Sequence, residues 1–206
     1  MAYSKNSKSR FFQFALCSLL VVTMLAAEVA FAIPPDTRKT MTIDATAMGT
    51  STQLGQVVNV KVTIYEFSTE EDRAILIEAF KQGKQQGLVN ALTKMKAVGR
   101  IAITGTLGYD LSFIRLIPTP TGRKIRFITN RQIRFGEAYY NTRSRDYDLT
   151  GGEIEINDSD KEKSGGILYP ATKFVINKDG QLEFQLFKNP WKLTNIIDWD
   201  KAGKPE

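Results

Sequence analysis

The stretch STEEDRAILIEAFKQGKQQGLVNALTKMKA (Ser68–Ala97) is the only long run of the chain with a helical period. It opens with Ser68 and Glu71, whose spacing fits a capping box, and acidic residues fill the first turn. Gly83 is typical of a helix end, so we expect two helices that meet there as a hairpin. The apolar side chains of both halves fall on one face and predict a core contact: Ile75, Leu76, Ala79, Phe80, Leu88, Ala91, Leu92 and Met95.

Segments with the alternation of a strand lie on both sides of this stretch. The clearest is Val57–Phe67, and further strands are expected near residues 100–104, 111–117, 123–129, 132–138, 153–157, 167–177, 181–187 and 191–199. The expected fold is α+β: a curved antiparallel sheet of about seven or eight strands, able to close partway into a barrel, with the helical hairpin on one face. An all-β sandwich or barrel with a helical insertion is the alternative.

Residues 1–32 have the organisation of a secretory signal peptide. A basic start is followed by the apolar run Phe11–Ala27 and by Ala30-Phe31-Ala32, which predicts cleavage between Ala32 and Ile33. The alternative is a retained anchor, but a run of about 17 residues is shorter than the roughly 20 that a membrane-spanning helix needs. We therefore expect a periplasmic or extracellular protein without a membrane span in the mature chain.

The mature chain divides into three parts on composition. Residues 33–56 are rich in threonine and form either a flexible lead-in or an edge strand. Residues 57–200 carry the strand and helix patterns of a single domain, and residues 201–206 form a tail.

The mature chain contains neither cysteine nor histidine, because the only cysteine, Cys17, lies in the predicted signal. This composition excludes a Ser-His-Asp triad, a cysteine nucleophile and metal sites built on histidine or cysteine, so we expect no metal and no cofactor. The whole chain has 28 basic and 22 acidic residues. Three of the basic and one of the acidic residues lie in the signal, and the remaining net charge of about +4 is too small to predict nucleic-acid binding.

Arginines and aromatic residues alternate between positions 123 and 147. Arginine holds carboxylates and phosphates bidentately, and tyrosine adds a hydroxyl donor and a stacking face. The pattern predicts a site for an anion, such as a sugar acid or a lipid headgroup, made of Arg126, Arg131, Arg134, Tyr139, Tyr140, Arg143 and Arg145. The alternative is that these arginines lie on exposed strand faces and pair with nearby carboxylates.

Two acidic segments have side chains that could take part in catalysis or bind a cation. Glu153 and Glu155 fall on one face of a strand, about 7 Å apart, which lies between the carboxylate separations of retaining and inverting glycosidases. The alternative is an ordinary exposed strand face. Residues 157–162 (NDSDKE) are rich in oxygen ligands but lack the glycine and the distal glutamate of an EF-hand, so we expect a solvated loop.

Three short segments, STEEDR (68–73), LGYD (107–110) and LTNI (193–196), occur in an order and spacing that resembles a family of uncharacterised exported bacterial proteins without an established activity. The resemblance covers most of the mature chain and implies export and a single domain. The function expected from the whole sequence is a non-catalytic binding or interaction protein of the cell envelope, with an anionic ligand. The alternatives are a carboxylate-dependent glycan hydrolase and a purely structural envelope component.

Overall fold

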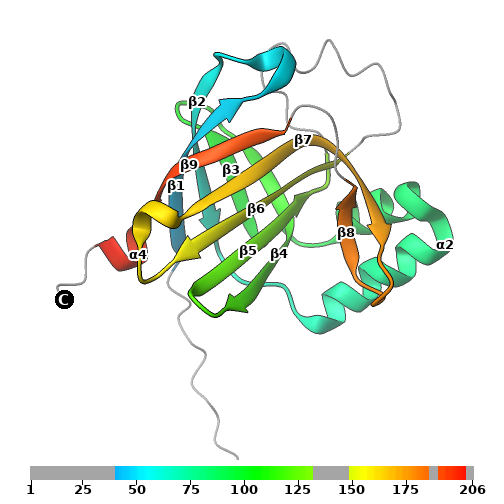
Figure 1. Ribbon diagram of the computed structural model, residues 1–206. Helices are drawn as coiled ribbons and strands as arrows, with labels where there is room; N and C mark the ends of the chain where they lie inside the picture. The colour runs from blue at the N-terminus through cyan, green and yellow to red at the C-terminus, as the bar shows by residue number, and fades with distance from the viewer. Residues whose placement is uncertain (1–39, 132–148, 186–189, 203–206) are drawn as a thin grey trace, which may run out of the picture. The chain divides into compact units, whose positions relative to one another are not determined.

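The computed structural model describes residues 40–131, 149–185 and 190–202, which form an antiparallel β-barrel (Figure 1). Each barrel strand pairs with the next one in the order β1-β2-β3-β4-β5-β6-β7-β9, and β9 pairs with β1 to close the ring. The bounds are Met41–Gly49 (β1), Val57–Ile64 (β2), Gly99–Ile103 (β3), Tyr109–Thr119 (β4), Gly122–Thr129 (β5), Leu149–Asn157 (β6), Gly165–Ile176 (β7) and Trp191–Asp198 (β9). The predicted antiparallel sheet is confirmed, but it closes fully.

The barrel interior is filled by the inward side chains of alternate strand residues. On β2, Val60, Val62 and Ile64 are buried, as the alternation of the sequence predicts. They pack with inward residues from the other strands, including Ile43, Ile101, Ile114, Ile125, Phe127, Ile154, Leu168, Trp191 and Leu193. The barrel therefore has a packed core.

The structure corrects the lead-in or edge-strand prediction for residues 40–56, the part of that segment that it describes. β1 pairs with β2 on one side and with β9 on the other, so Met41–Gly49 is an interior strand of the barrel, neither a lead-in nor an edge strand. Its inward residues include the small Ala45 and Ala47. The short 3-10 turn η1 (Ser51–Gln53) then leads into β2.

The predicted helical hairpin forms α2 (Glu70–Lys94), in which two helical segments meet at a kink at Lys84. The backbone of Lys84 (φ 51°, ψ −138°) leaves the helical region one residue after Gly83, where the sequence predicted the break. The N-cap is Thr69, whose side chain accepts from the backbone N–H of Asp72, one residue later than predicted. Across the described ranges, no helix is both long and apolar enough to cross a membrane.

A second apolar cluster joins α2 to the outside of the barrel. It contains the buried side chains Leu76, Phe80, Leu88 and Leu92 of α2, together with Phe113, Ile128, Leu149 and Phe174 from the strands. The predicted core contact of the helical stretch is confirmed by this cluster, although Ile75 is 54% exposed. Strand β8 (Leu182–Gln185) pairs with the last part of β7 beside α2 (Figure 1).

Two glycines, Gly151 and Gly152, lie inside β6, which begins before the strand predicted near residues 153–157. A Cβ atom at Gly151 would lie 2.0 Å from the Phe184 ring, and one at Gly152 would lie 2.3 Å from the Phe127 ring. Phe127 belongs to the barrel core and Phe184 to the outer cluster. The paired glycines thus let one aromatic ring pack directly on each face of β6.

At one end of the barrel, the pairing of β9 is irregular. Asp44 of β1 faces Ile197, whereas Thr46 faces Thr194, so β9 has a bulge at Asn195, whose φ is +50°. The pairing of β9 with β7 stops at Leu193 and Gly166, and residues 194–198 continue past it. They run beside the connection between β6 and β7, which contains the 3-10 turn η2 (Lys161–Lys163), before the short helix α4 (Trp199–Ala202).

Candidate ligand site at one end of the barrel

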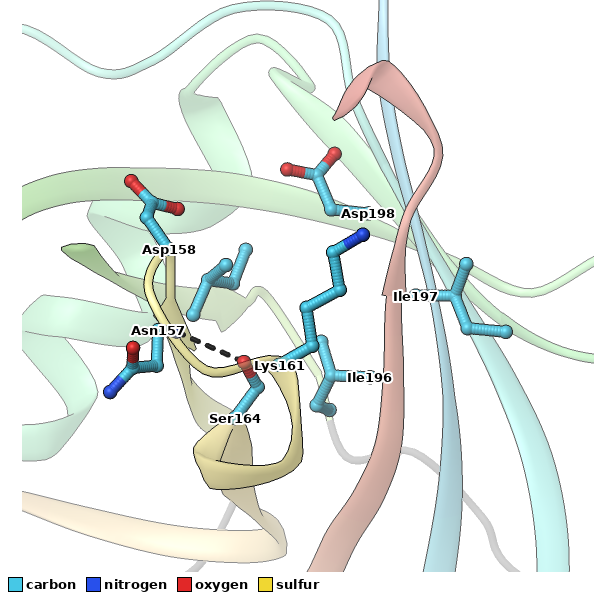
Figure 2. A pocket seen from close by; sticks show the side chains of 8 residues that line it. Asn157, Asp158, Lys161, Ser164, Ile196, Ile197 and Asp198 are labelled. Carbon is cyan, nitrogen blue, oxygen red and sulfur yellow. Dashed lines mark hydrogen bonds between the residues drawn. The ribbon is translucent and has the colours of Figure 1, made fainter. Parts of the chain in front are cut away.

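A pocket of about 140 Å³ opens between the β6–β7 connection and the end of β9; we call it the end pocket. One wall comes from β6 and its connection, and the other from β9 (Figure 2). The lining residues are Ile156, Asn157, Asp158, Lys161, Ser164, Ile196, Ile197 and Asp198. Because β9 continues beyond its pairing with β7, this gap follows directly from the strand lengths and the bulge.

The β6–β7 connection is held in shape by its own polar groups. The side-chain oxygen of Asn157 accepts from the backbone N–H groups of Ser159 (3.0 Å) and Asp160 (2.8 Å). The backbone N–H of Asn157 donates to the Ser164 hydroxyl at 2.9 Å, and Asp160 caps η2 through Glu162 N–H. These oxygens are used within the loop, and the described part of the chain contains no cluster of three or more metal-binding side chains.

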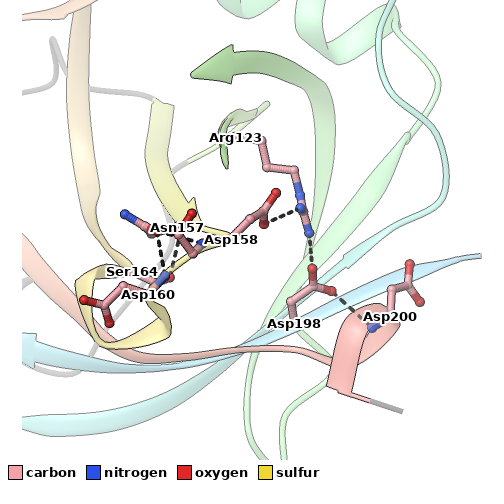
Figure 3. A network of polar contacts seen from close by, with 8 residues as sticks. Arg123, Asn157, Asp158, Asp160, Ser164, Asp198 and Asp200 are labelled. Carbon is pink, nitrogen blue, oxygen red and sulfur yellow. Dashed lines mark hydrogen bonds and ion pairs between the residues drawn. The ribbon is translucent and has the colours of Figure 1, made fainter. Parts of the chain in front are cut away.

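Arg123 ties the two walls of the end pocket together (Figure 3). One guanidinium nitrogen lies 3.0 Å from Asp158 on the connection, and the other forms an ion pair with Asp198 on β9. Asp198 also accepts from the backbone N–H of Asp200 at 3.1 Å. The side chains of Arg123 and Asp198 are only 16% and 7% exposed, so this bridge is largely shielded from water.

Most hydrogen-bond acceptors of the pocket already have partners, whereas two of its donor groups have none in the described part of the chain. The oxygens of Asn157 and Asp198 already accept hydrogen bonds, and Asp158 is held by Arg123. In contrast, Lys161 forms no ion pair with any described residue, and the Ser164 hydroxyl accepts a bond while no described group accepts its proton. Figure 2 shows the amino group of Lys161 extending across the pocket. The pocket therefore offers free donors and engaged acceptors.

The predicted arginine–tyrosine site is described only in part. Arg126 lies on the outer face of β5, donates to Glu153 at 2.7 and 3.0 Å, and covers the Phe184 ring at 5.4 Å. Arg131 is exposed, and its Nε donates to the Asn130 side chain at 3.1 Å. The other predicted members lie outside the described residues: Arg134, Tyr139, Tyr140, Arg143 and Arg145. The predicted site thus stays a prediction.

Glu153 and Glu155 lie on the outward side of β6, where Lys124 binds both. Its amino nitrogen is 2.9 Å from Glu153 and 3.8 Å from Glu155. Burial opposes ionisation of Glu153, but hydrogen bonds from Lys124 and Arg126 outweigh it and hold the Glu153 pKa below its usual value. A carboxyl with a lowered pKa is ionised at neutral pH and is poorly suited to donate a proton to a glycosidic oxygen.

This pairing predicts a pH dependence of stability. The pKa of Glu153 is lower in the folded state than its value of about 4.3 in the unfolded chain. Ionised Glu153 therefore stabilises the fold above about pH 4.3, and this stabilisation is lost as the pH falls through the folded-state pKa. Glu153→Gln should therefore lower the free energy of unfolding at pH 7. The variant should also lose less of this free energy than the wild type as the pH falls, measured by urea unfolding between pH 7 and 3. Glu155→Gln, on the same face, is the control, and an equal effect of both substitutions would contradict the prediction.

The residues of the end pocket were not selected from the sequence, although a signal was present. Arg123 has the same strand parity as the inward Ile125 and Phe127, and Asp158 continues the inward series of Ile154 and Ile156. Extending the alternation to the strand ends would have placed both charges at the barrel opening. Asp198 could not be placed in this way, because the bulge at Asn195 shifts by one residue the alternation of inward and outward side chains along β9.

The chain was compared with known protein families, curated proteins and solved structures. No family model matches the chain, and no curated protein or solved structure is significantly similar to it.

Proposed function

We propose that the chain is an exported binding protein of the cell envelope that holds a small anionic ligand in the end pocket without catalysing a reaction. One observation carries the proposal: the pocket's acceptors are engaged, while the Lys161 ammonium and the Ser164 hydroxyl are available to donate. A ligand that supplies acceptor oxygens satisfies these donors. Export rests on the signal-like residues 1–32, and the mass of the exported chain would test the predicted start at Ile33.

Charge alone does not select the ligand. Arg123 and Lys161 carry two positive charges, and Asp158 and Asp198 carry two negative ones, so the formal charges around the pocket cancel. A cationic ligand would need a carboxylate oxygen, and those of Asp198 already accept from Arg123 and from Asp200 N–H. An anion can bind Lys161 without breaking a described ion pair.

The non-catalytic part of the proposal rests on the chemistry of the lining. The chain has no histidine, and the two carboxylates that line the pocket, Asp158 and Asp198, are both ion-paired to Arg123. Glu153 and Glu155 lie outside the pocket, on the outer face of β6. We therefore place ligand binding, and no bond cleavage, at this end of the barrel.

The proposal is tested by thermal unfolding in the presence of butanoate, butylammonium or butanol at matched ionic strength. These three compounds share an alkyl chain and differ in the charge of the head group. Only butanoate should raise the Tm, because a ligand that binds the folded state alone stabilises it by mass action. Lys161→Ala should abolish the shift, since it removes the free cation of the pocket.

Lys163→Ala is the matched control, because Lys163 lies in the same turn and pairs with Asp160 at 3.1 Å. It should leave the butanoate shift unchanged. An equal rise in Tm with butylammonium or butanol would overturn the anionic ligand, and an undiminished butanoate shift in Lys161→Ala would overturn the site.

A further inference from the structure

We infer that the ligand of the end pocket is a monocarboxylate with a short aliphatic chain, a conclusion that rests on the proposed function and names its ligand class. The pocket joins two unlike surfaces: the donors Lys161 and Ser164, and an apolar surface formed by three isoleucines, Ile156, Ile196 and Ile197. A ligand that fills the pocket must match both surfaces at once.

The apolar surface requires an alkyl body on the ligand. Ile156 belongs to the barrel core and Ile196 packs against that core, so the inner side of the pocket is continuous with the barrel interior. Ile197 lies at the outer side and is 43% exposed. A purely polar anion would leave these side chains in contact with water, whereas an alkyl chain would cover them.

The charge distribution requires a single negative charge. Among the residues that line the pocket, Lys161 is the one cation, and it has no ion pair with a described residue; Asp158 and Asp198 line the same pocket. A second negative charge on the ligand would lie close to these carboxylates without a cation of its own and would be repelled. A carboxylate therefore fits better than a phosphate dianion.

Isothermal titration calorimetry with acetate, butanoate, hexanoate and inorganic phosphate tests this inference. Each added CH₂ group should tighten binding by about fourfold until the apolar surface is covered, so hexanoate should bind best and phosphate should bind worse than butanoate. Lys161→Ala should weaken all three carboxylates by about tenfold or more, because each of them loses the same charged hydrogen bond.

Ile197→Ser separates the two parts of the pocket. It should reduce the gain from butanoate to hexanoate and leave acetate binding unchanged. Ile167→Ser is its control, because Ile167 is similarly exposed, at 40%, but does not line the pocket. Ile167→Ser should change neither value.

The titrations distinguish a wrong ligand class from a wrong proposed function. If affinity depends on Lys161 but does not increase with chain length, or if phosphate binds as tightly as hexanoate, the aliphatic monocarboxylate is wrong and the anion site stands. If no carboxylate binds in a manner that depends on Lys161, the inference and the proposed function are both overturned.

Discussion

Replacing Arg123 by alanine is expected to lower the free energy of unfolding by about 3 kcal/mol or more, because it leaves a buried carboxylate without its cation. Asp198 is 7% exposed and pairs with Arg123, which also holds Asp158 across the end pocket. Urea unfolding followed by circular dichroism at pH 7 measures the loss. Lys163→Ala should cost about 0.5 kcal/mol or less, since its pair with Asp160 is exposed to solvent.

The loss can be assigned to the unpaired charges by removing all of them. Arg123→Met combined with Asp158→Asn and Asp198→Asn leaves no ion unpaired and should recover most of the stability lost in Arg123→Ala. A loss in Arg123→Ala no larger than that in Lys163→Ala would show that Arg123 does not hold the two walls together.

Gly152→Val is expected to destabilise the barrel by about 3 kcal/mol, by forcing a side chain into a filled core. A Cβ at Gly152 would lie 2.3 Å from the Phe127 ring, which is fully buried and has little room to move. Thermal unfolding provides the measurement. Gly83→Ala is the control, because open space surrounds its Cβ position, and it should leave stability unchanged or raise it by up to about 1 kcal/mol.

A compensating change tests whether the Phe127 ring is the cause. Phe127→Leu removes part of the ring volume, so adding it to Gly152→Val should cost less than the sum of the two single substitutions. Simple additivity of the two losses would mean that strain elsewhere in β6 accounts for the effect.

The helical stretch shows which structural features can be predicted from local sequence patterns. The apolar face, the break near Gly83 and a capping box at the start were all predictable, because each depends on residues within a few positions. The cap itself was placed one residue early. Ser68 is unavailable for capping because its N–H donates to the Ile114 carbonyl at 2.8 Å and its hydroxyl accepts from the Ile114 N–H at 3.0 Å. A contact with β4 thus moved the cap to Thr69.

A barrel was one of the expected folds, but local patterns do not decide whether the sheet closes fully. β1 has a weak apolar signal, since its inward positions include Ala45 and Ala47, and its position between β2 and β9 depends on contacts across the whole chain. The register shift between β6 and β7 lies beside Pro170, which lacks an N–H to donate to the neighbouring strand. The predicted bounds of β5 and β9 agree with the structure to within one residue at each end, whereas β1 was the hardest strand to predict.

The candidate site depends on residues that the predicted arginine–tyrosine site did not include. Arg123 alternates with the inward Ile125 and Phe127, so its side chain points into the barrel end. Its partner Asp198 is brought near only by the bulge in β9 and by closure of the ring. Local alternation can identify the first residue, and only the tertiary fold can identify the second.

The most direct test of the account is a titration of the purified, ¹⁵N-labelled protein with hexanoate, followed by the backbone amide signals. Hexanoate should cause concentration-dependent shifts in the amide signals of residues 157–164 and 196–198, which form the two walls of the end pocket. Amides around Arg126 and Glu153, on the outer face of β5 and β6, should not shift. Shifts centred on that outer face or on Arg131, or no shifts in the pocket residues, would contradict the claim that this end of the barrel binds a small carboxylate.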